Sequence, residues 1–137
     1  GVVFPEIVGE PGFSDVSRTL DLIEQLQPRI IVPGHGRVFT DLTGALSRAR
    51  ERLHLFMNDP LKHASHAAKV FLKFKLLDWQ HISDDELWAW SKHCGFLLLL
   101  HEQYFVTMDR QEWITQCMHD LVRVGAAQRD GVYWVNA

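Results

Sequence analysis

The chain has 137 residues, 47% of them hydrophobic and 11% aromatic, and a net charge of −3 with histidine neutral. This length suits one domain or two small ones, because single domains commonly contain about 50 to 200 residues. The acidic balance argues against a protein that neutralises many nucleic-acid phosphates. No apolar run approaches the roughly 20 residues that span a bilayer, and the start lacks the basic and long apolar regions of a secretory leader. We therefore expect a cytoplasmic protein without a membrane partner.

The two cysteines, Cys94 and Cys117, lie far apart and form no CxxC pair. This spacing predicts two buried free thiols in a reducing compartment, with a single disulfide as the alternative. The chain also starts without methionine, so we expect it to be a piece of a longer protein.

The first 32 residues predict a strand, a helix and a second strand. Residues 1–7 resemble a strand end followed by a turn at Pro5, and Ser14 or Asp15 is placed to cap the helix. The helix has one apolar face, formed by Val16, Leu20, Ile23 and Leu26. Pro28 ends it, and the β-branched run 30–32 suits a short buried strand. This succession is typical of a βαβ unit with parallel pairing.

Three helices are predicted between residues 41 and 95. Asp41 or Thr43 caps the first, whose apolar stripe is Leu46, Ala49, Leu53 and Phe56. The second begins with Asn58 or Asp59 as cap and Pro60 in its first turn. Its predicted inward residues are Ala67, Val70, Phe71, Phe74 and either Leu76 or Leu77. The third begins with a capping box made by Ser83 and Glu86, and Gly95 ends it.

The last 42 residues predict a helix and a hairpin. Residues 96–105 fit either a strand or a buried helix, because periodicity does not separate the two. A helix follows from an Asp109 cap to Gly125, and residues 126–136 form two alternating runs around a turn at 129–131. Helices followed by a two-stranded hairpin are the layout of a winged helix. We place the domain boundary between residues 59 and 60, giving an α/β part (1–59) and a mainly helical winged-helix part (60–137).

The motif PGHG, Pro33 to Gly36, ends the second predicted strand. Proline stops a strand because it has no N–H to donate, and the glycines allow a sharp turn with open space around His35. The end of a strand is where α/β proteins often place functional side chains. The simpler interpretation is a glycine-rich turn whose histidine bonds only to a backbone carbonyl.

In this strand-to-helix context, PGHG resembles the last metal-ligand motif of the metallo-β-lactamase superfamily. Several of its members, including hydrolases similar to human β-lactamase-like protein 2, append a winged-helix domain soon afterwards. The resemblance implies an αββα fold, a zinc-dependent hydrolase with two divalent metals, and His35 as one metal ligand within the loop of Pro33, Gly34 and Gly36. In this reading, activated water attacks an ester, thioester, amide or phosphodiester.

The family's HxHxDH motif is absent from these residues, as are its other metal ligands. We therefore expect a C-terminal fragment that is inactive and binds no stoichiometric zinc alone, because zinc sites normally use three or four protein ligands. The expected partner is the N-terminal part of the same domain. The sequence names no catalytic residue beyond the ligand, no substrate-binding residue and no small-molecule substrate.

Other polar residues have simpler explanations. His63 and His66 share a helix face, and with His54 or Asp59 they match a metal site, but a half-exposed polar stripe explains them as well. Cys117 and His119 do not face each other on a helix, which argues against a catalytic dyad. The acidic residues of the third helix complement its amide end and are predicted as capping residues: Asp84, Asp85 and Glu86.

Two alternatives to the hydrolase remain, a nucleic-acid-binding winged helix and a protein-interaction module. The helix that would enter a DNA groove, 109–124, has two arginines against three acidic residues, which argues against nucleic acid. Helical spacing favours packing over base stacking for Trp79, Trp88, Trp90 and Trp113, and Trp134 is expected to pack the wing onto the helices. Exposed aromatics within 86–105 would instead favour a homodimer.

Overall fold

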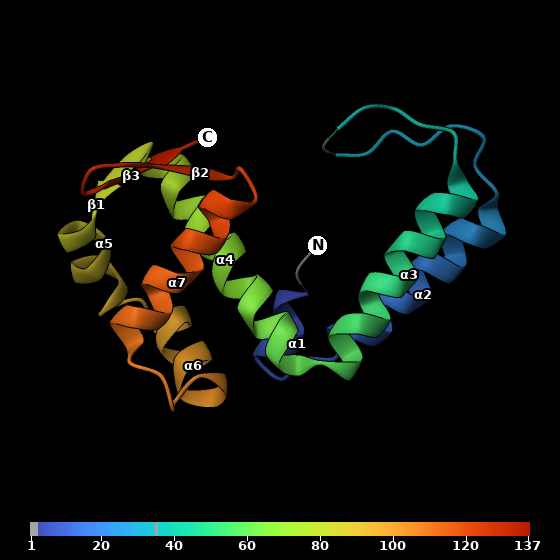
Figure 1. Ribbon diagram of the computed structural model, residues 1–137. Coiled ribbons are helices and arrows are strands. Elements are labelled where there is room, and N and C mark those ends of the chain that lie inside the picture. Colours follow the sequence, from blue (N-terminus) through green and yellow to red (C-terminus); the bar gives the residue numbers. More distant parts are fainter. Residues whose placement is uncertain (1–2, 35) are drawn as a thin grey trace. The chain divides into compact units, whose positions relative to one another are not determined.

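The computed structural model describes residues 3–34 and 36–137, which form a mainly helical chain with one small sheet (Figure 1). The chain divides into two compact units, unit 1 over residues 3–63 and unit 2 over residues 64–137. The division lies within helix α4 (Pro60–Trp79), close to the predicted boundary. In the described part of the chain, no helix is both long enough and apolar enough to cross a membrane.

Unit 1 is built on two helices, α2 (Gly12–Leu26) and α3 (Leu42–Asn58), preceded by the short helix α1 (Phe4–Ile7). α2 and α3 pack side by side in opposite directions (Figure 1). The Arg50 guanidinium of α3 donates to Asp21 and Glu24 of α2 at 2.9 and 2.8 Å. These hydrogen bonds hold the pKa of the Glu24 carboxyl below its usual range and raise the pKa of Arg50. The pair therefore stays ionised over the whole physiological range.

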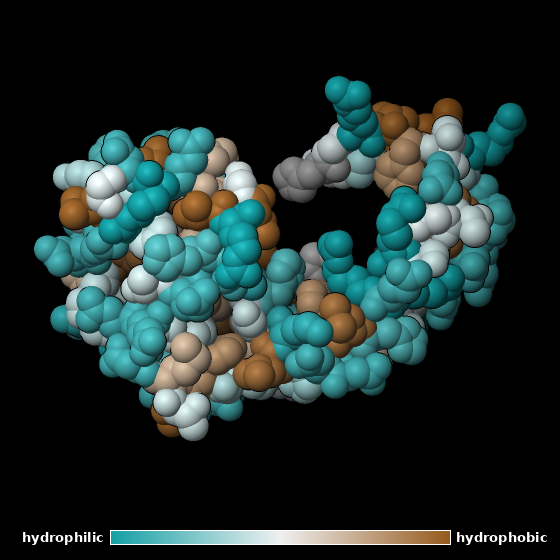
Figure 2. Space-filling model, in the orientation of Figure 1, coloured by the Kyte–Doolittle hydropathy of each residue, from teal (hydrophilic) through white to brown (hydrophobic). Residues whose placement is uncertain are grey.

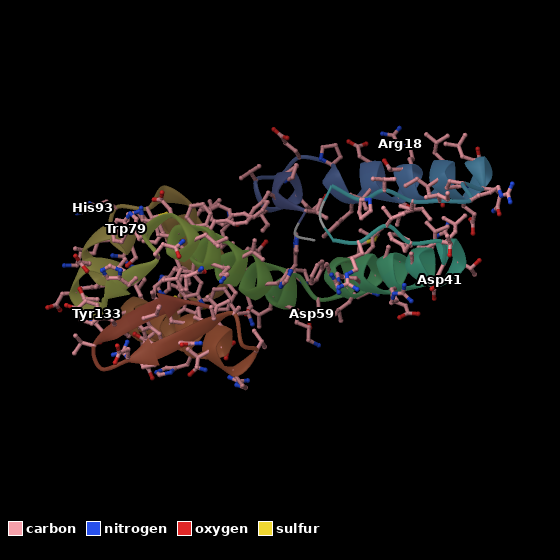
Figure 3. The ribbon with its side chains drawn as sticks, turned by 90° about the horizontal axis from the view of Figure 1, so that it is seen from above. Arg18, Asp41, Asp59, Trp79, His93 and Tyr133 are labelled. Carbon is pink, nitrogen blue, oxygen red and sulfur yellow. The ribbon has the colours of Figure 1, made fainter. Side chains whose placement is uncertain are left out.

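Side-chain caps mark the starts of α3 and α4. The Asp41 carboxylate accepts the N–H of Gly44 at the start of α3, and Asp59 accepts the N–H of Lys62 at the start of α4 (Figure 3). Both lie among the caps predicted from sequence. The predicted cap of α2 is wrong, because this helix begins earlier, at Gly12, and has no side-chain cap.

The strand predictions for unit 1 are wrong in the described residues. The turn predicted at Pro5 is instead helix α1, which uses proline in its first turn, and the strand end predicted before it falls partly on residues 1 and 2, outside the described residues. The predicted strand 30–32 is reduced to one antiparallel bridge, in which Ile31 exchanges N–H···O bonds with Phe39. A three-residue apolar run becomes a buried strand only when other strands flank it, and the described part of unit 1 provides none.

Unit 2 combines four helices with a three-stranded antiparallel sheet. After α4 come β1 (His81–Ser83), α5 (Asp84–Ser91), α6 (Gly95–Tyr104), α7 (Arg110–Arg123), β2 (Ala127–Asp130) and β3 (Tyr133–Asn136). β3 lies in the middle of the sheet, with β1 and β2 on its two sides. The ambiguous segment 96–105 is thus helical, and Gly95 begins α6 rather than ending α5. The predicted hairpin is confirmed, but its turn lies at residues 131–132 rather than 129–131, because Arg129 and Asp130 belong to β2. The short strand β1 was not predicted.

The core of unit 2 is formed by side chains from α4, α6, α7 and the sheet. Its fully buried side chains include Leu72, Leu76, Ile82, Leu97, Leu100, Ile114, Met118 and Trp134. The predicted inward face of α4 is correct for Ala67 and Leu76 and wrong for Phe74 and Leu77, which are exposed. Cys117 is buried in this core as a free thiol, and Cys94 is free and half-buried rather than buried.

Unit 2 contains two local signals that the sequence identified correctly. Asp109 caps α7 by accepting the N–H of Glu112. α7 ends at Arg123, and Gly125 follows with a φ of +73°, which lets the N–H of Ala126 reach back to the carbonyl of Leu121. This left-handed turn is the reason for glycine at that position, and it directs the chain into the hairpin.

We expect Ser83→Ala to destabilise unit 2 by about 0.5–2 kcal/mol, the usual cost of losing an N-cap. The Ser83 hydroxyl accepts the N–H of Glu86, and the Glu86 carboxylate accepts the N–H of Ser83 at 2.9 Å. Alanine removes the first bond and leaves that helix N–H to water. Urea unfolding measures the loss, and Ser83→Thr, which keeps a hydroxyl, is the control. A Thr variant as unstable as the Ala variant would show that the cap is not the cause.

Candidate functional site

The candidate site is the loop that joins α2 to α3 and carries the PGHG motif. α2 ends at Gln27, whose φ of 44° breaks the helix, and Pro28 prevents it from continuing. The bridge between Ile31 and Phe39, with N···O distances of 2.8 and 3.1 Å, then pairs the two arms of the loop. This bridge joins the two described arms of the loop, residues 30–34 and 36–40, at one point.

His35, the predicted metal ligand, lies outside the described residues, so its predicted role stays a prediction. Its neighbours are described: Pro33 is half-buried, and Gly34 and Gly36 are exposed. Gly36 has a φ of +93°, where a side chain would be strained, and no described atom lies within 4 Å of the position a Cβ would take at either glycine. The described surroundings of the motif are therefore open.

One face of the loop is apolar and exposed. Side chains alternate along paired arms, so Ile30, Val32 and Val38 lie on the face opposite to Ile31 and Phe39. Ile31 and Phe39 are half-buried, whereas Val32 is 76% exposed and its two companions are similarly accessible. Exposed Leu22 and Leu26 extend this character onto α2. Figure 2 shows the apolar colouring where the loop leaves the helices. We call these five side chains, Leu22, Leu26, Ile30, Val32 and Val38, the apolar loop face.

Unit 1 also contains a cleft of about 460 Å³ between α2 and α3. Its walls are mostly apolar, and Arg48 and Arg52 of α3 supply its only charged side chains among the described residues that line it. Arg48 pairs with Asp41 at 3.5 Å, a contact that is largely exposed to solvent. This cleft has no nucleophile or metal donor in its described wall.

The described residues contain no cluster of three or more histidine, cysteine or acidic side chains able to hold a metal ion. The metal site considered for His63 and His66 is therefore not formed there. The alternative, a half-exposed polar stripe, is wrong for His63, which is 4% exposed. Its Nε2 accepts the N–H of Val3 at 3.2 Å and is not free to bind a metal.

Cys117 and His119 form no dyad, as predicted. Cys117 points into the core, where burial raises the pKa of its thiol to about 12, so it remains protonated and unreactive. His119 lies on an exposed part of α7 and packs edge-on against Trp134, with ring centroids 5.0 Å apart.

A second hollow, of about 320 Å³, lies in unit 2 between α5, α7 and the hairpin. Its base is Asp84, which accepts Arg129 Nη1 at 2.7 Å and Trp134 Nε1 at 2.8 Å. The hydrogen bond from Arg129 holds the pKa of the Asp84 carboxyl below its usual range. Sequence reasoning treated Asp84 only as a helix-end carboxylate. Its role in joining α5 to both strands of the hairpin depends on residues about 45 and 50 positions away, so no local pattern could reveal it.

Comparison with models of protein families, with curated proteins and with solved structures finds no match to this chain.

Proposed function

We propose that this chain is the C-terminal part of a metal-dependent hydrolase of the metallo-β-lactamase type, in which His35 is one metal ligand. The observation that carries the proposal is the described part of the PGHG loop, which lies between an arm-to-arm bridge and a capped helix and has open space at Gly34 and Gly36. A metal ligand needs such access, because the cation must be reached by other ligands and by substrate. A structural turn has no need of it.

The apolar loop face supports the same proposal. An apolar surface of several adjacent side chains is usually covered by another part of the protein. Within the described residues, the backbone groups of Ile30 and Val32 also form no hydrogen bond with other backbone groups. Further strands of a larger domain would use both features, by pairing with the outer arm and by burying its side chains. In that setting residues 30–32 become the buried strand that their sequence favours.

We also propose that unit 2 is the winged-helix domain that such hydrolases append. The first strand, β1, returns to pair with β3 of the hairpin, so the three helices α4, α5 and α7 are tied to one small sheet. Trp134 and Asp84 lock this hairpin against α5 and α7. We assign this domain a role in substrate access or subunit contacts of the hydrolase.

The chain supplies one metal donor, so it does not hold a catalytic metal by itself. When bound in the complete site, divalent metals generate hydroxide near neutral pH and polarise the scissile group. The contribution of these residues is positional. The bridge at Ile31 and the Asp41 cap fix the two ends of the loop, and the proposed role of His35 is to supply a neutral imidazole as ligand.

The test uses the longer protein, with the sequence that precedes this chain. We expect His35→Ala to lower its hydrolytic activity more than about 100-fold and to reduce its bound zinc, because a lost ligand costs more than a lost supporting contact. His54→Ala, which changes an exposed histidine of α3, is the matched control and should retain both. Unchanged zinc content in the His35 variant would refute the proposal. So would sub-micromolar, His35-dependent zinc binding by residues 1–137 alone, which would imply a site complete within the chain.

The second candidate function is a protein-interaction module. It is favoured by exposed apolar side chains at the ends of α7 and of the hairpin, Val124, Val132 and Tyr133. Nucleic acid is less well supported, because α7 together with its Asp109 cap has three acidic residues against two arginines, and Asp120 engages both Lys69 and Arg123. Sedimentation at several concentrations tests for a homodimer. Salt-sensitive retention of random duplex in a gel shift would favour the nucleic-acid alternative instead.

A further inference from the structure

His63 occupies an unusual position for a histidine, in the interior of unit 1. It lies in the first turns of α4 and is 4% exposed. Its ring packs against Phe13 of α2 and Phe56 of α3, with centroid distances of 5.1 and 4.8 Å. Its Nε2 accepts the backbone N–H of Val3, which directly precedes α1. One imidazole on α4 therefore contacts α2, α3 and the residue that precedes α1.

The hydrogen bond to Val3 requires a neutral ring. Nε2 accepts a proton donor only through its lone pair, so in this state the single ring proton must be on Nδ1. A second proton would convert Nε2 into a donor facing the N–H of Val3. Two donors would then face each other at 3.2 Å in a buried place, which replaces an attraction with a repulsion.

Few negative charges lie near His63 that could stabilise its protonated, positively charged ring. On α1, Glu6 favours the charged ring, but its carboxylate already accepts the N–H of Phe13 at 2.9 Å. α2 and α3 contribute the phenyl rings, and Asp59 at the end of α3 caps α4. On α4 itself, Lys62 and His66 add no negative charge. Burial outweighs Glu6 and lowers the pKa of His63 below its ordinary value of 6.5.

We propose that the contacts of His63 attach residues 3–14 to the junction of α3 and α4. This attachment is acid-sensitive, and the segment is released when the ring gains a second proton. Apart from the contacts of the buried Ile7 and Gly12, the local structure of this segment is weak, since α1 is a single turn and α2 lacks a side-chain cap. Its release exposes the start of α2 and one side of α3. The device is independent of the proposed hydrolase function.

The direction of the pH dependence follows from the lowered pKa. Because the folded ring resists protonation, the stabilisation is complete above about pH 6.5, the pKa of the released ring, and is lost as pH falls below it. The loss continues until the pH reaches the lower pKa that the ring has while residues 3–14 are attached. Between these limits one proton is coupled to release, so the equilibrium shifts about tenfold per pH unit.

The test is amide hydrogen exchange of the whole chain between pH 7.5 and 5.0, expressed as protection factors. We expect protection of residues 3–14 to fall about tenfold per pH unit below about 6.5. All five tryptophans lie in unit 2, so their fluorescence reports independently that unit 2 stays folded. Constant protection of residues 3–14 down to pH 5.0 would overturn the proposal.

Three variants separate His63 from other titrating groups. His63→Gln keeps an oxygen acceptor without a titrating ring and should abolish the pH step. His66→Gln changes the neighbouring histidine and should leave the step in place. Glu6→Gln keeps an acceptor for Phe13 but removes the nearby negative charge, and should extend the loss of protection to lower pH without moving its onset near pH 6.5. A step that persists in His63→Gln contradicts the proposal. If that variant does not fold, the ring titration of His63 in the unmodified chain decides, and a midpoint at or above 6.5 rejects it.

Discussion

Replacing Trp134 with alanine should destabilise unit 2 by about 3–5 kcal/mol, the usual cost of truncating a buried aromatic side chain. Trp134 is 1% exposed and lies on β3, the central strand. His119 of α7 packs on its edge, and the guanidinium of Arg129 on β2 lies 4.1 Å from its ring centroid. Its Nε1–H donates to Asp84 of α5. The variant therefore opens a cavity where two helices meet the sheet and also leaves Asp84 without one donor.

Urea unfolding followed by tryptophan fluorescence measures this loss, because the four remaining tryptophans are all in unit 2. Tyr133→Ala is the matched control: it removes the adjacent aromatic ring, which is 44% exposed, and should cost much less. Trp134→Phe isolates the hydrogen bond, with an expected loss of about 1 kcal/mol beyond the change in packing. Equal losses in the Trp134 and Tyr133 alanine variants would show that the hairpin is not anchored through Trp134.

The contrast between the two units shows which parts of this fold are encoded locally. In unit 2, the helix ends were predictable because Ser83, Asp109 and Gly125 each satisfy backbone groups within a few residues of their own position. The packing role of Trp134 was also predicted, from its place in the hairpin. Strand β1 was missed because three residues give no usable alternation, and its pairing with β3 depends on residues more than 50 positions away.

In unit 1 the sequence predicted the wrong kind of structure for the segment around Pro5 and for the run 30–32. The run 30–32 has the composition of a buried strand, but a strand needs neighbours, and in the described residues Ile31 pairs only with Phe39. The burial of His63 was equally hidden from sequence. Its contacts with Val3 and Phe13 join residues about 60 and 50 positions apart, and helical periodicity placed it only on a shared face with His66.

The exposed side chains of α4 lead to the second large prediction. Leu72 and Leu77 are the same residue type on the same helix, but Leu72 is 1% exposed and Leu77 is 47% exposed. Helical periodicity predicted Leu76 or Leu77 as inward, and the structure selects Leu76. Leu72→Ala is expected to lower the free energy of unfolding of unit 2 by about 2–5 kcal/mol. The variant loses the burial of the removed methyl and methylene groups, and it also leaves a cavity in the core.

Leu77→Ala provides the control within the same helix and is expected to change stability by about 0.5 kcal/mol or less, as is usual for exposed positions. Alanine has the higher helix propensity, so neither substitution weakens the helix itself. The difference between the two variants, measured by urea unfolding with tryptophan fluorescence, therefore reports burial alone. A loss for Leu77→Ala close to that for Leu72→Ala would mean that the outer face of α4 is covered in solution. That result would point to contacts of this helix beyond those within unit 2, and sedimentation would then test whether a second copy of the chain provides them.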